Sequence, residues 1–260
     1  MPFFPTYIKP VIDLAITLSI WTYYIFGYIC FFAPFYAVAA VVSENRETAF
    51  QHLNHLFYKG MFLLVRAIPR LRIHVHDDVR TIRSSVIVCN HLSYLDPILL
   101  ISLFEQQKTI VKSDFFKLPV FGWVLNASGY LPSDASGRFA PLVIERVEGM
   151  AEYLASGGNL FIFPEGTRSR DGKIGPFNKG AFRIAARCDA PIQVLQIRNT
   201  DKLFRPGKFL FNTCVRNDIE VKLIASIAPD YKSKDFSLSE LMRQVRDLFE
   251  NKSESSGELK

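Results

Sequence analysis

Residues 85–97 read SVIVCNHLSYLDP, and this stretch decides the fold class. Residues 85–89 are mostly apolar and β-branched, which is typical of a buried strand. Pro97 favours the first turn of a helix and pushes the residue before it out of the helical conformation. We therefore expect a strand that ends near Asn90, a short turn, and a helix that begins near Asp96.

Strands and helices alternate along much of the chain. Apolar or alternating runs predict further strands at residues 71–76, 160–163, 191–197 and 219–227. Helical spacing of apolar residues predicts helices at residues 138–155, 180–188 and 238–248. Such an alternation indicates an α/β layer architecture. With 260 residues, the chain is long enough for one sizeable domain and an appendage.

The appendage is apolar. Residues 14–42 contain no charged side chain, and about 20 apolar residues are enough to cross a bilayer. A cleaved signal peptide fits poorly because the run is too long and Lys9 is the only basic residue before it. Its many aromatic side chains favour lipid contact, with a buried core helix as the alternative. Gly27 and Pro34 interrupt the run, so it is either one tilted span or two shorter helices that re-enter the same leaflet.

Residues 43–66 carry apolar side chains at helical spacing, which predicts an amphipathic helix. This helix either lies on the membrane surface or faces the core. We therefore interpret residues 1–66 as a membrane-anchoring helical region. Basic residues are sparse before the apolar run and frequent after it, and by the positive-inside rule this places the rest of the protein in the cytoplasm.

The chain is basic, with a formal net charge of +6 at pH 7. Many basic residues gather at and after residues 163–169, which favours anionic partners such as phosphate, lipid headgroups, coenzyme A or an acidic carrier protein. No helix-turn-helix, zinc-finger or RNP pattern supports a nucleic-acid partner. The four cysteines are widely spaced, and His74 and His76 have no third ligand near them in the sequence, so we expect no metal site.

His91 and Asp96 are candidates for a general base and its orienting carboxylate. A histidine is the natural base near neutral pH, and a carboxylate on its other ring nitrogen fixes the tautomer and stabilises the imidazolium. The two side chains can meet if His91 ends the strand and Asp96 begins the helix. Alternatively, Asp96 only caps the helix. Ser93 and Cys89 lack a nucleophile elbow, so we interpret them as a turn residue and a buried strand residue.

Residues 163–169 read FPEGTRS and follow a short apolar strand. They therefore lie at the carboxyl end of that strand, where α/β sheets tend to place ligands. Arg168 can hold a phosphate through two parallel hydrogen bonds, and the backbone N–H groups of Gly166 and Thr167 can add to this grip. Glu165 can hydrogen-bond a hydroxyl or order Arg168. The alternative is a surface turn with a Glu–Arg ion pair of little energetic value.

Together, the two motifs resemble the signature of the glycerolipid acyltransferases, and most closely that of the lysophosphatidate acyltransferases. That signature is Asn-His-x4-Asp followed by Phe-Pro-Glu-Gly-Thr-Arg-Ser. Three further segments agree with the family: residues 112–122, 177–181 and 190–194. The resemblance implies a mixed β-sheet flanked by helices, in a catalytic domain that we assign to residues 67–250. The polar residues 251–260 are expected to form a disordered tail.

The resemblance also implies direct acyl transfer from a thioester to the hydroxyl of a lysolipid. His91 would take the proton of that hydroxyl while Asp96 holds His91 in place. Lys112 and Arg168 would bind the acceptor phosphate, and Glu165 its glycerol part. No cofactor or metal is implied, because the acyl donor, acyl-CoA or acyl-carrier protein, already carries a good leaving group.

One segment departs from the family. Its second block commonly ends Gly-x-Ile-Phe-Ile-Asp-Arg, whereas residues 129–135 read GYLPSDA here. Ala135 takes the place of the family's arginine, a suspected acceptor contact, unless Arg138 replaces it. The leading hypothesis is a membrane-bound lysophosphatidate acyltransferase that makes phosphatidate in phospholipid biosynthesis. The alternatives are an acyltransferase for another lysophospholipid or a lyso-aminolipid, and a lipid-binding membrane protein without catalytic activity.

Overall fold

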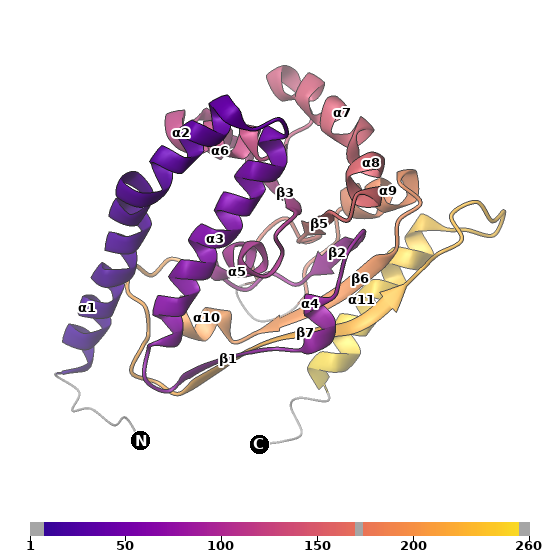
Figure 1. Ribbon diagram of the computed structural model, residues 1–260. Helices are drawn as coiled ribbons and strands as arrows, with labels where there is room; N and C mark the ends of the chain where they lie inside the picture. The colour runs from indigo at the N-terminus through magenta and orange to yellow at the C-terminus, as the bar shows by residue number, and fades with distance from the viewer. Residues whose placement is uncertain (1–7, 170–173, 255–260) are drawn as a thin grey trace. The chain divides into compact units, whose positions relative to one another are not determined.

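A β-sheet organises the protein (Figure 1). The computed structural model describes residues 8–169 and 174–254, and in them seven strands lie in the order β1-β7-β6-β2-β5-β3-β4. In chain order the strands span Leu71–Val75, Val86–Cys89, Gln107–Val111, Leu131–Pro132, Asn159–Ile162, Ile192–Arg198 and Asn217–Ile227. The pairs β1–β7, β2–β6, β2–β5, β3–β5 and β3–β4 are parallel.

The neighbours β6 and β7 have the opposite sense. Arg198, the last residue of β6, forms an ion pair with Glu220 of β7 at 3.6 Å. The next residue, Asn199, donates its side-chain N–H to the carbonyl of Asp218 at 2.7 Å. The end of β6 therefore lies beside the start of β7, as in an antiparallel pair. The sheet is mixed, and the expected fold class is confirmed.

The chain forms two compact units. The N-terminal unit contains Met1–Val75, Leu92–Gln106 and Ile197–Val221. The C-terminal unit contains His76–His91, Gln107–Gln196 and Lys222–Lys260. The predicted membrane-anchoring region thus shares a unit with three segments of the predicted catalytic domain, residues 67–75, 92–106 and 197–221.

Strands β2 and β5 form the centre of the C-terminal unit and are buried along their whole length. Strands that are buried on both faces appear in a sequence as continuous apolar runs, which is why these two were predicted. They share a core with α8 (Met150–Ala155), α9 (Gly180–Arg187) and α11 (Leu238–Glu254). Other helices of the unit are α4 (Asp77–Arg80), η2 (Ser113–Lys117), α6 (Pro119–Ala127) and η3 (Gly137–Phe139).

Two predicted helices differ in their limits. The helix expected at residues 138–155 is divided at Gly149 into α7 (Ala140–Glu148) and α8. Helix α11 continues to Glu254, so the start of the expected disordered tail at residue 251 is wrong. An ion pair between Arg246 and Glu250, one helical turn apart, supports the end of this helix. Residues 255–260 lie outside the described residues.

Strand β3 was not predicted, because it begins with three polar residues that are nevertheless buried: Gln107, Lys108 and Thr109. The side-chain oxygen of Gln107 accepts a hydrogen bond from the Tyr130 hydroxyl at 2.8 Å. The ammonium group of Lys108 lies 4.1 Å from the centre of the Tyr153 ring. Partners that are distant in the sequence therefore compensate for burying these polar groups.

In the N-terminal unit, α1 (Lys9–Thr22), η1 (Tyr23–Phe32) and α2 (Ala33–Val42) form one helix that is long and apolar enough to cross a membrane. Gly27 and Pro34 do not divide it. The ten residues of η1 are π-helical, an arrangement that absorbs irregularities in long helices. Pro34 lies in the first turn of α2, where its missing N–H is tolerated.

Helix α3 (Arg46–Arg66) runs back beside this long helix (Figure 1). Phe57 of α3 is buried, and five aromatic rings lie around it: those of Tyr23, Tyr24, Tyr28, Phe32 and Tyr58. The Tyr23 hydroxyl donates to the carbonyl of Phe57 at 2.8 Å. Of the two interpretations of residues 43–66, the core-facing helix is the one in the structure.

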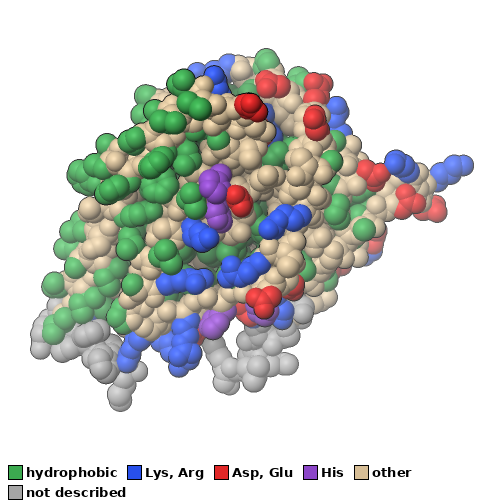
Figure 2. Space-filling model, viewed as in Figure 1, with side chains coloured by type: hydrophobic (Ala, Val, Ile, Leu, Met, Phe, Trp, Pro, Cys, Tyr) green, Lys and Arg blue, Asp and Glu red, His purple; other side chains and the backbone are tan. Residues whose placement is uncertain are grey.

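The opposite face of the long helix is apolar and exposed (Figure 2). The hydrophobic side chains that cover α1, η1 and α2 there are each at least half exposed: Val11, Leu18, Phe26, Ile29, Phe31, Phe35, Val38, Val41 and Val42. Large exposed apolar patches mark surfaces for protein or membrane contact. The helix therefore presents an apolar face that the rest of its unit leaves uncovered.

Candidate active site

The two sequence motifs meet at one edge of the sheet. Strands β2 and β5 are parallel neighbours with Val88 opposite Ile162, so their carboxyl ends lie side by side. His91 follows β2, and residues 163–169 follow β5. The imidazole ring of His91 stacks on the ring of Phe163, with ring centres 4.3 Å apart. Each motif thus begins where its strand ends, as the sequence predicted.

Glu165 connects the two motifs. Its side chain is only 8% exposed, and its Oε1 atom accepts a hydrogen bond from the backbone N–H of His91 at 3.2 Å. Its Oε2 atom accepts one from the N–H of Gly175 at 3.0 Å. In addition, the N–H of Ser169 donates to the carbonyl of His91 at 2.8 Å. The turn that carries His91 is therefore fixed to the loop after β5 through its backbone on both sides.

Gly166 shapes this loop. Its φ angle is +68°, in the left-handed region that favours glycine, and a Cβ atom there would lie 2.9 Å from Nδ2 of Asn178. Its N–H, which we expected to face a phosphate, instead donates to the carbonyl of Phe163 at 3.0 Å. The backbone N–H of Asn178 closes the loop by donating to the carbonyl of Pro164 at 2.7 Å. The structural role of Gly166 is thus to form the turn.

The remaining predicted acceptor contacts lie at the same edge. Arg168 is half-buried, whereas Thr167 is exposed. Lys112 directly follows β3, which is the parallel neighbour of β5, and its ammonium group lies 3.3 Å from the carboxylate of Asp114. Hydrogen bonds from Lys117 and Lys112 hold the pKa of Asp114 below its usual value. Three adjacent strand ends therefore carry a histidine, an arginine and a lysine.

Asp96 belongs to the N-terminal unit, at the second residue of α5 (Leu95–Leu103). It is fully buried, and its Oδ2 atom accepts hydrogen bonds from the N–H groups of Leu92 at 2.6 Å and Ser93 at 2.7 Å. Its Oδ1 atom accepts one from the hydroxyl of Thr200 at 2.5 Å. A capping residue would instead accept from N–H groups that follow it, so the alternative of a simple helix cap is wrong. The pairing of Asp96 with the His91 imidazole stays a prediction.

The structure supports the interpretation of Ser93 and Cys89. Ser93 is fully buried and its hydroxyl donates to the carbonyl of Phe204 at 2.8 Å, while the N–H of Leu95 donates to that hydroxyl at 3.3 Å. Ser93 is thus a turn residue. Cys89 is a fully buried residue of β2.

The segment that departs from the family, residues 129–135, includes β4. Ala135 is exposed, and Arg138 lies in η3 with its guanidinium 4.7 Å from the centre of the Phe139 ring. Upstream, the N–H of Asp134 donates to the hydroxyl of Ser113 at 2.8 Å. Because β4 is the parallel neighbour of β3, this segment leaves the sheet at the same edge as Lys112.

Thr200 is a contact of Asp96 that sequence reasoning missed completely. It lies 104 residues after Asp96, at the start of the short helix α10 (Thr200–Leu203). Threonine has many roles, and nothing in the sequence around residue 200 connects it with the first motif. The contact forms because β6, which precedes α10, leads the chain to the turn that contains Asp96.

The fold and the two motifs are those of an acyltransferase family. Residues 70–198, about half of the chain, match the family model that is described as acyltransferase, and the chain belongs to this family. Within it, the chain is similar to 1-acyl-sn-glycerol-3-phosphate acyltransferases, as its sequence motifs predicted.

Two curated relatives illustrate the similarity. The chloroplastic 1-acyl-sn-glycerol-3-phosphate acyltransferase BAT2 of Brassica napus is 39% identical over 123 residues, which are 47% of this chain and 35% of the relative. The 1-acyl-sn-glycerol-3-phosphate acyltransferase of Saccharomyces cerevisiae is 30% identical over 165 residues, 62% of this chain and 53% of the relative. The chain therefore matches about a third to a half of the length of these relatives.

A solved structure shares the fold. The crystal structure of the 1-acyl-sn-glycerophosphate acyltransferase PlsC from Thermotoga maritima superposes with a TM-score of 0.70 and 23% sequence identity. The match covers 94% of this chain and 97% of that chain. It thus includes the N-terminal helices as well as the sheet.

Proposed function

We propose that this protein transfers a fatty acyl group from a thioester to the free hydroxyl of lysophosphatidate and so makes phosphatidate. The observation that supports this most is the connection of the two motifs through Glu165 and Ser169. It places the His91 imidazole beside the loop that carries Arg168. A base and an anion-binding side chain at neighbouring strand ends suit an acceptor that has a hydroxyl near a phosphate.

In this proposal His91 is the general base. It removes the proton of the acceptor hydroxyl as the oxygen attacks the thioester carbonyl, and the thiolate of the donor leaves. Asp96 holds the imidazole and stabilises the imidazolium that forms. Hydrogen bonds from Leu92, Ser93 and Thr200 hold this buried carboxylate in place.

Arg168 and Lys112 hold the acceptor phosphate, with Thr167 beside them. Glu165 acts mainly by fixing the backbone of His91, because both of its oxygen atoms accept backbone hydrogen bonds. This assignment replaces the glycerol contact that the resemblance implied for Glu165. The acyl donor is acyl-CoA or acyl-carrier protein, and the reaction needs no metal or other cofactor because the thiolate is a good leaving group.

The long helix Lys9–Val42 attaches the enzyme to the membrane that holds its lipid substrates. Its exposed apolar face and its length support this location. The basic residues that follow it support a catalytic domain in the cytoplasm.

The test is an assay of the full chain in lipid vesicles with lysophosphatidate and either acyl donor, with phosphatidate measured by mass spectrometry. We expect turnover that His91→Ala abolishes. His74→Ala, at an exposed position on β1, is the matched control and should remain active. Lipid binding without turnover would instead identify a non-catalytic lipid-binding protein.

A second acceptor class is favoured by the segment 129–135, in which Ala135 replaces the family's arginine. The same base chemistry would then acylate another lysophospholipid or a lyso-aminolipid. A panel of lysolipids assayed side by side distinguishes the two proposals. Preference for an acceptor without phosphate would contradict the role of Arg168.

A further inference from the structure

Thr200 and Asp96 form a buried contact in the N-terminal unit that connects distant parts of the sequence. Both side chains are fully buried, and the Thr200 hydroxyl lies 2.5 Å from Oδ1 of Asp96. The other carboxylate oxygen is held by the turn of Asp96 itself, through Leu92 and Ser93. Thr200 therefore fixes the oxygen that the turn leaves to other partners.

The backbone around Thr200 is held firmly. Asn199 adopts a left-handed conformation with φ of 63°, which turns the chain from β6 into α10. Its side chain donates to the carbonyl of Asp218 at 2.7 Å, and the side chain of Asn217 donates to the carbonyl of Asn199 at 3.0 Å. At the other end of α10, the carbonyl of Phe204 accepts the hydroxyl of Ser93. Helix α10 thus contacts the Asp96 turn at both of its ends.

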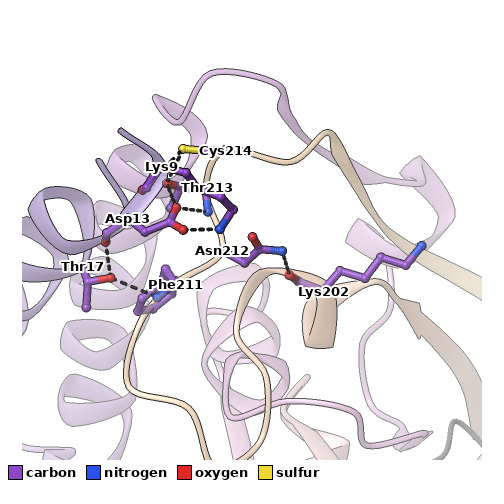
Figure 3. Close-up of polar contacts among 8 residues, drawn as sticks. All are labelled: Lys9, Asp13, Thr17, Lys202, Phe211, Asn212, Thr213 and Cys214. Atoms are coloured by element: carbon purple, nitrogen blue, oxygen red, sulfur yellow. Dashed lines mark hydrogen bonds and ion pairs between the residues drawn. The ribbon is translucent and has the colours of Figure 1, made fainter. Parts of the chain in front are cut away.

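The loop after α10 folds back on this helix. The N–H of Asn212 donates to the carbonyl of Leu203 at 2.8 Å, and its side chain donates to the carbonyl of Lys202 at 3.1 Å (Figure 3). The rings of Phe204 and Phe211 stack with centres 4.4 Å apart and planes 9° apart. A displacement of residues 211–213 would therefore move α10.

The same loop is fastened to α1 by a buried carboxylate (Figure 3). Asp13 is 4% exposed, and its Oδ1 atom accepts hydrogen bonds from the N–H of Thr213 at 2.8 Å and the hydroxyl of Thr213 at 2.6 Å. The N–H of Phe211 donates to the hydroxyl of Thr17 at 2.9 Å. Lys9 pairs with the other oxygen of Asp13. Polar contacts of this kind are unusual on a helix whose outer face is apolar.

We propose that Thr200 is a positioning residue for Asp96, and that the contact of Asp13 with Thr213 holds Thr200 in place. The position of the N-terminal apolar helix then determines the position of the Asp96 carboxylate, which orients His91. The inference rests on the proposed function, in which Asp96 orients His91. It adds a route by which the membrane helix controls the reaction without touching substrate.

The first experiment measures steady-state kinetics of the full chain in vesicles. Thr200→Val removes the hydroxyl at nearly constant volume, and we expect kcat to fall about 10-fold, the effect of one lost hydrogen bond to a charged group. The KM for lysophosphatidate should stay unchanged, because Thr200 does not contact substrate. Thr200→Ser keeps the hydroxyl and should restore kcat. Thr213→Val should lower kcat by a smaller factor, and Thr213→Ser should restore it.

A double-mutant cycle separates positioning from general stability. In a chain that already carries Asp96→Ala, Thr200→Val should have no further effect on the residual kcat, because the two residues act as one unit. Additive losses, or a normal kcat in Thr200→Val with only a lower melting temperature, would overturn the positioning role.

The second experiment does not depend on activity, so it can fail or succeed separately from the proposed function. Hydrogen exchange is measured by mass spectrometry on peptides that contain residues 91–96. Thr213→Val should speed the exchange of the Leu92 and Ser93 amides if the contact on α1 holds the Asp96 turn. Faster exchange confined to residues 9–20 and 204–214 would refute the connection to Asp96. An inactive wild-type chain would refute the proposed function alone.

Discussion

Glu165 and Asp96 are buried carboxylates in the two motifs, but the structure uses them in different ways. Both oxygen atoms of Glu165 accept backbone N–H groups, from His91 and from Gly175. Asp96 accepts two backbone N–H groups on one oxygen and the side-chain hydroxyl of Thr200 on the other. Glu165 thus connects two backbone segments, whereas Asp96 is also held by a side chain.

The difference agrees with the proposal that Asp96, and not Glu165, takes part in the chemistry. A carboxylate whose two oxygens both hold backbone groups is fixed in a structural role, because moving it would break the loop. In Asp96 only one oxygen is held by backbone N–H groups, and the other accepts from the Thr200 hydroxyl, the contact that the proposed positioning role uses. A motif acid can therefore serve the site without touching substrate.

The largest effect is expected at His91, the proposed general base. His91→Ala should lower kcat about 10²- to 10⁴-fold, equivalent to about 3–5 kcal/mol, because the general base is lost. Its fold should persist, since the contacts of Glu165 and Ser169 involve the backbone of His91. Circular dichroism and the vesicle assay together check this, and near-normal turnover would contradict the assigned base.

Two substitutions, each of which removes one carboxylate charge, test the comparison of Glu165 with Asp96 directly. In Glu165→Gln the new amide NH₂ must face a backbone N–H, so we expect a loss of about 2 kcal/mol in the free energy of unfolding. In Asp96→Asn the NH₂ can face the hydroxyl of Thr200, which can accept, so the loss should be about 1 kcal/mol or less. Activity should follow the opposite order, with Asp96→Asn the more impaired variant.

Chemical unfolding of the two purified variants measures the difference in stability. Equal destabilisation, or better turnover by Asp96→Asn than by Glu165→Gln, would mean that the two carboxylates have the same role.

The loop around Glu165 depends on one glycine. Gly166→Ala should cost about 1–2 kcal/mol, because its φ of +68° is left-handed and the new methyl group would approach Asn178. Gly180→Ala is the matched control, since a Cβ atom there would meet nothing within 4 Å. Thermal unfolding of both variants checks this, and an equal change in melting temperature would argue against strain at Gly166.

The smallest effect is expected at the exposed edge of the site. Lys112→Ala should raise the KM for lysophosphatidate about 2- to 5-fold, because an exposed charge contact is worth at most about 1 kcal/mol. Stability should not change. Lys117→Ala removes the other lysine that contacts Asp114, and it should leave KM unchanged. A similar KM in both variants would show that Lys112 does not contact the phosphate.

Sequence reasoning predicted the elements whose signals are local. The apolar run at residues 85–89 contains β2, and α5 begins at Leu95, close to the expected start, although Asp96 before Pro97 is itself helical. Strand β3 was not predicted because Gln107 and Lys108 are polar, and their partners, Tyr130 and Tyr153, come later in the chain. Alternation of apolar and polar residues cannot predict a strand whose buried polar side chains find their partners only in the folded protein.

The candidate site divides in the same way. Residue types and spacing predicted His91, Asp96 and Arg168 as its chemical groups. The role of Glu165 could not be predicted, because its partner Gly175 lies in another part of the loop. A contact with a backbone N–H group also does not depend on residue type, so the sequence gives no sign of it.

The sequence by itself determined the α/β class, the strand ends that carry the motifs, the apolar N-terminal helix and the family, because each depends on short-range patterns of residue type. The tertiary structure alone decided that Thr200 holds Asp96 and that Asp13 holds Thr213, across 104 and 200 residues. Such contacts form only when the fold brings distant segments of the chain together. A buried carboxylate is stable only when the fold supplies its hydrogen-bond donors.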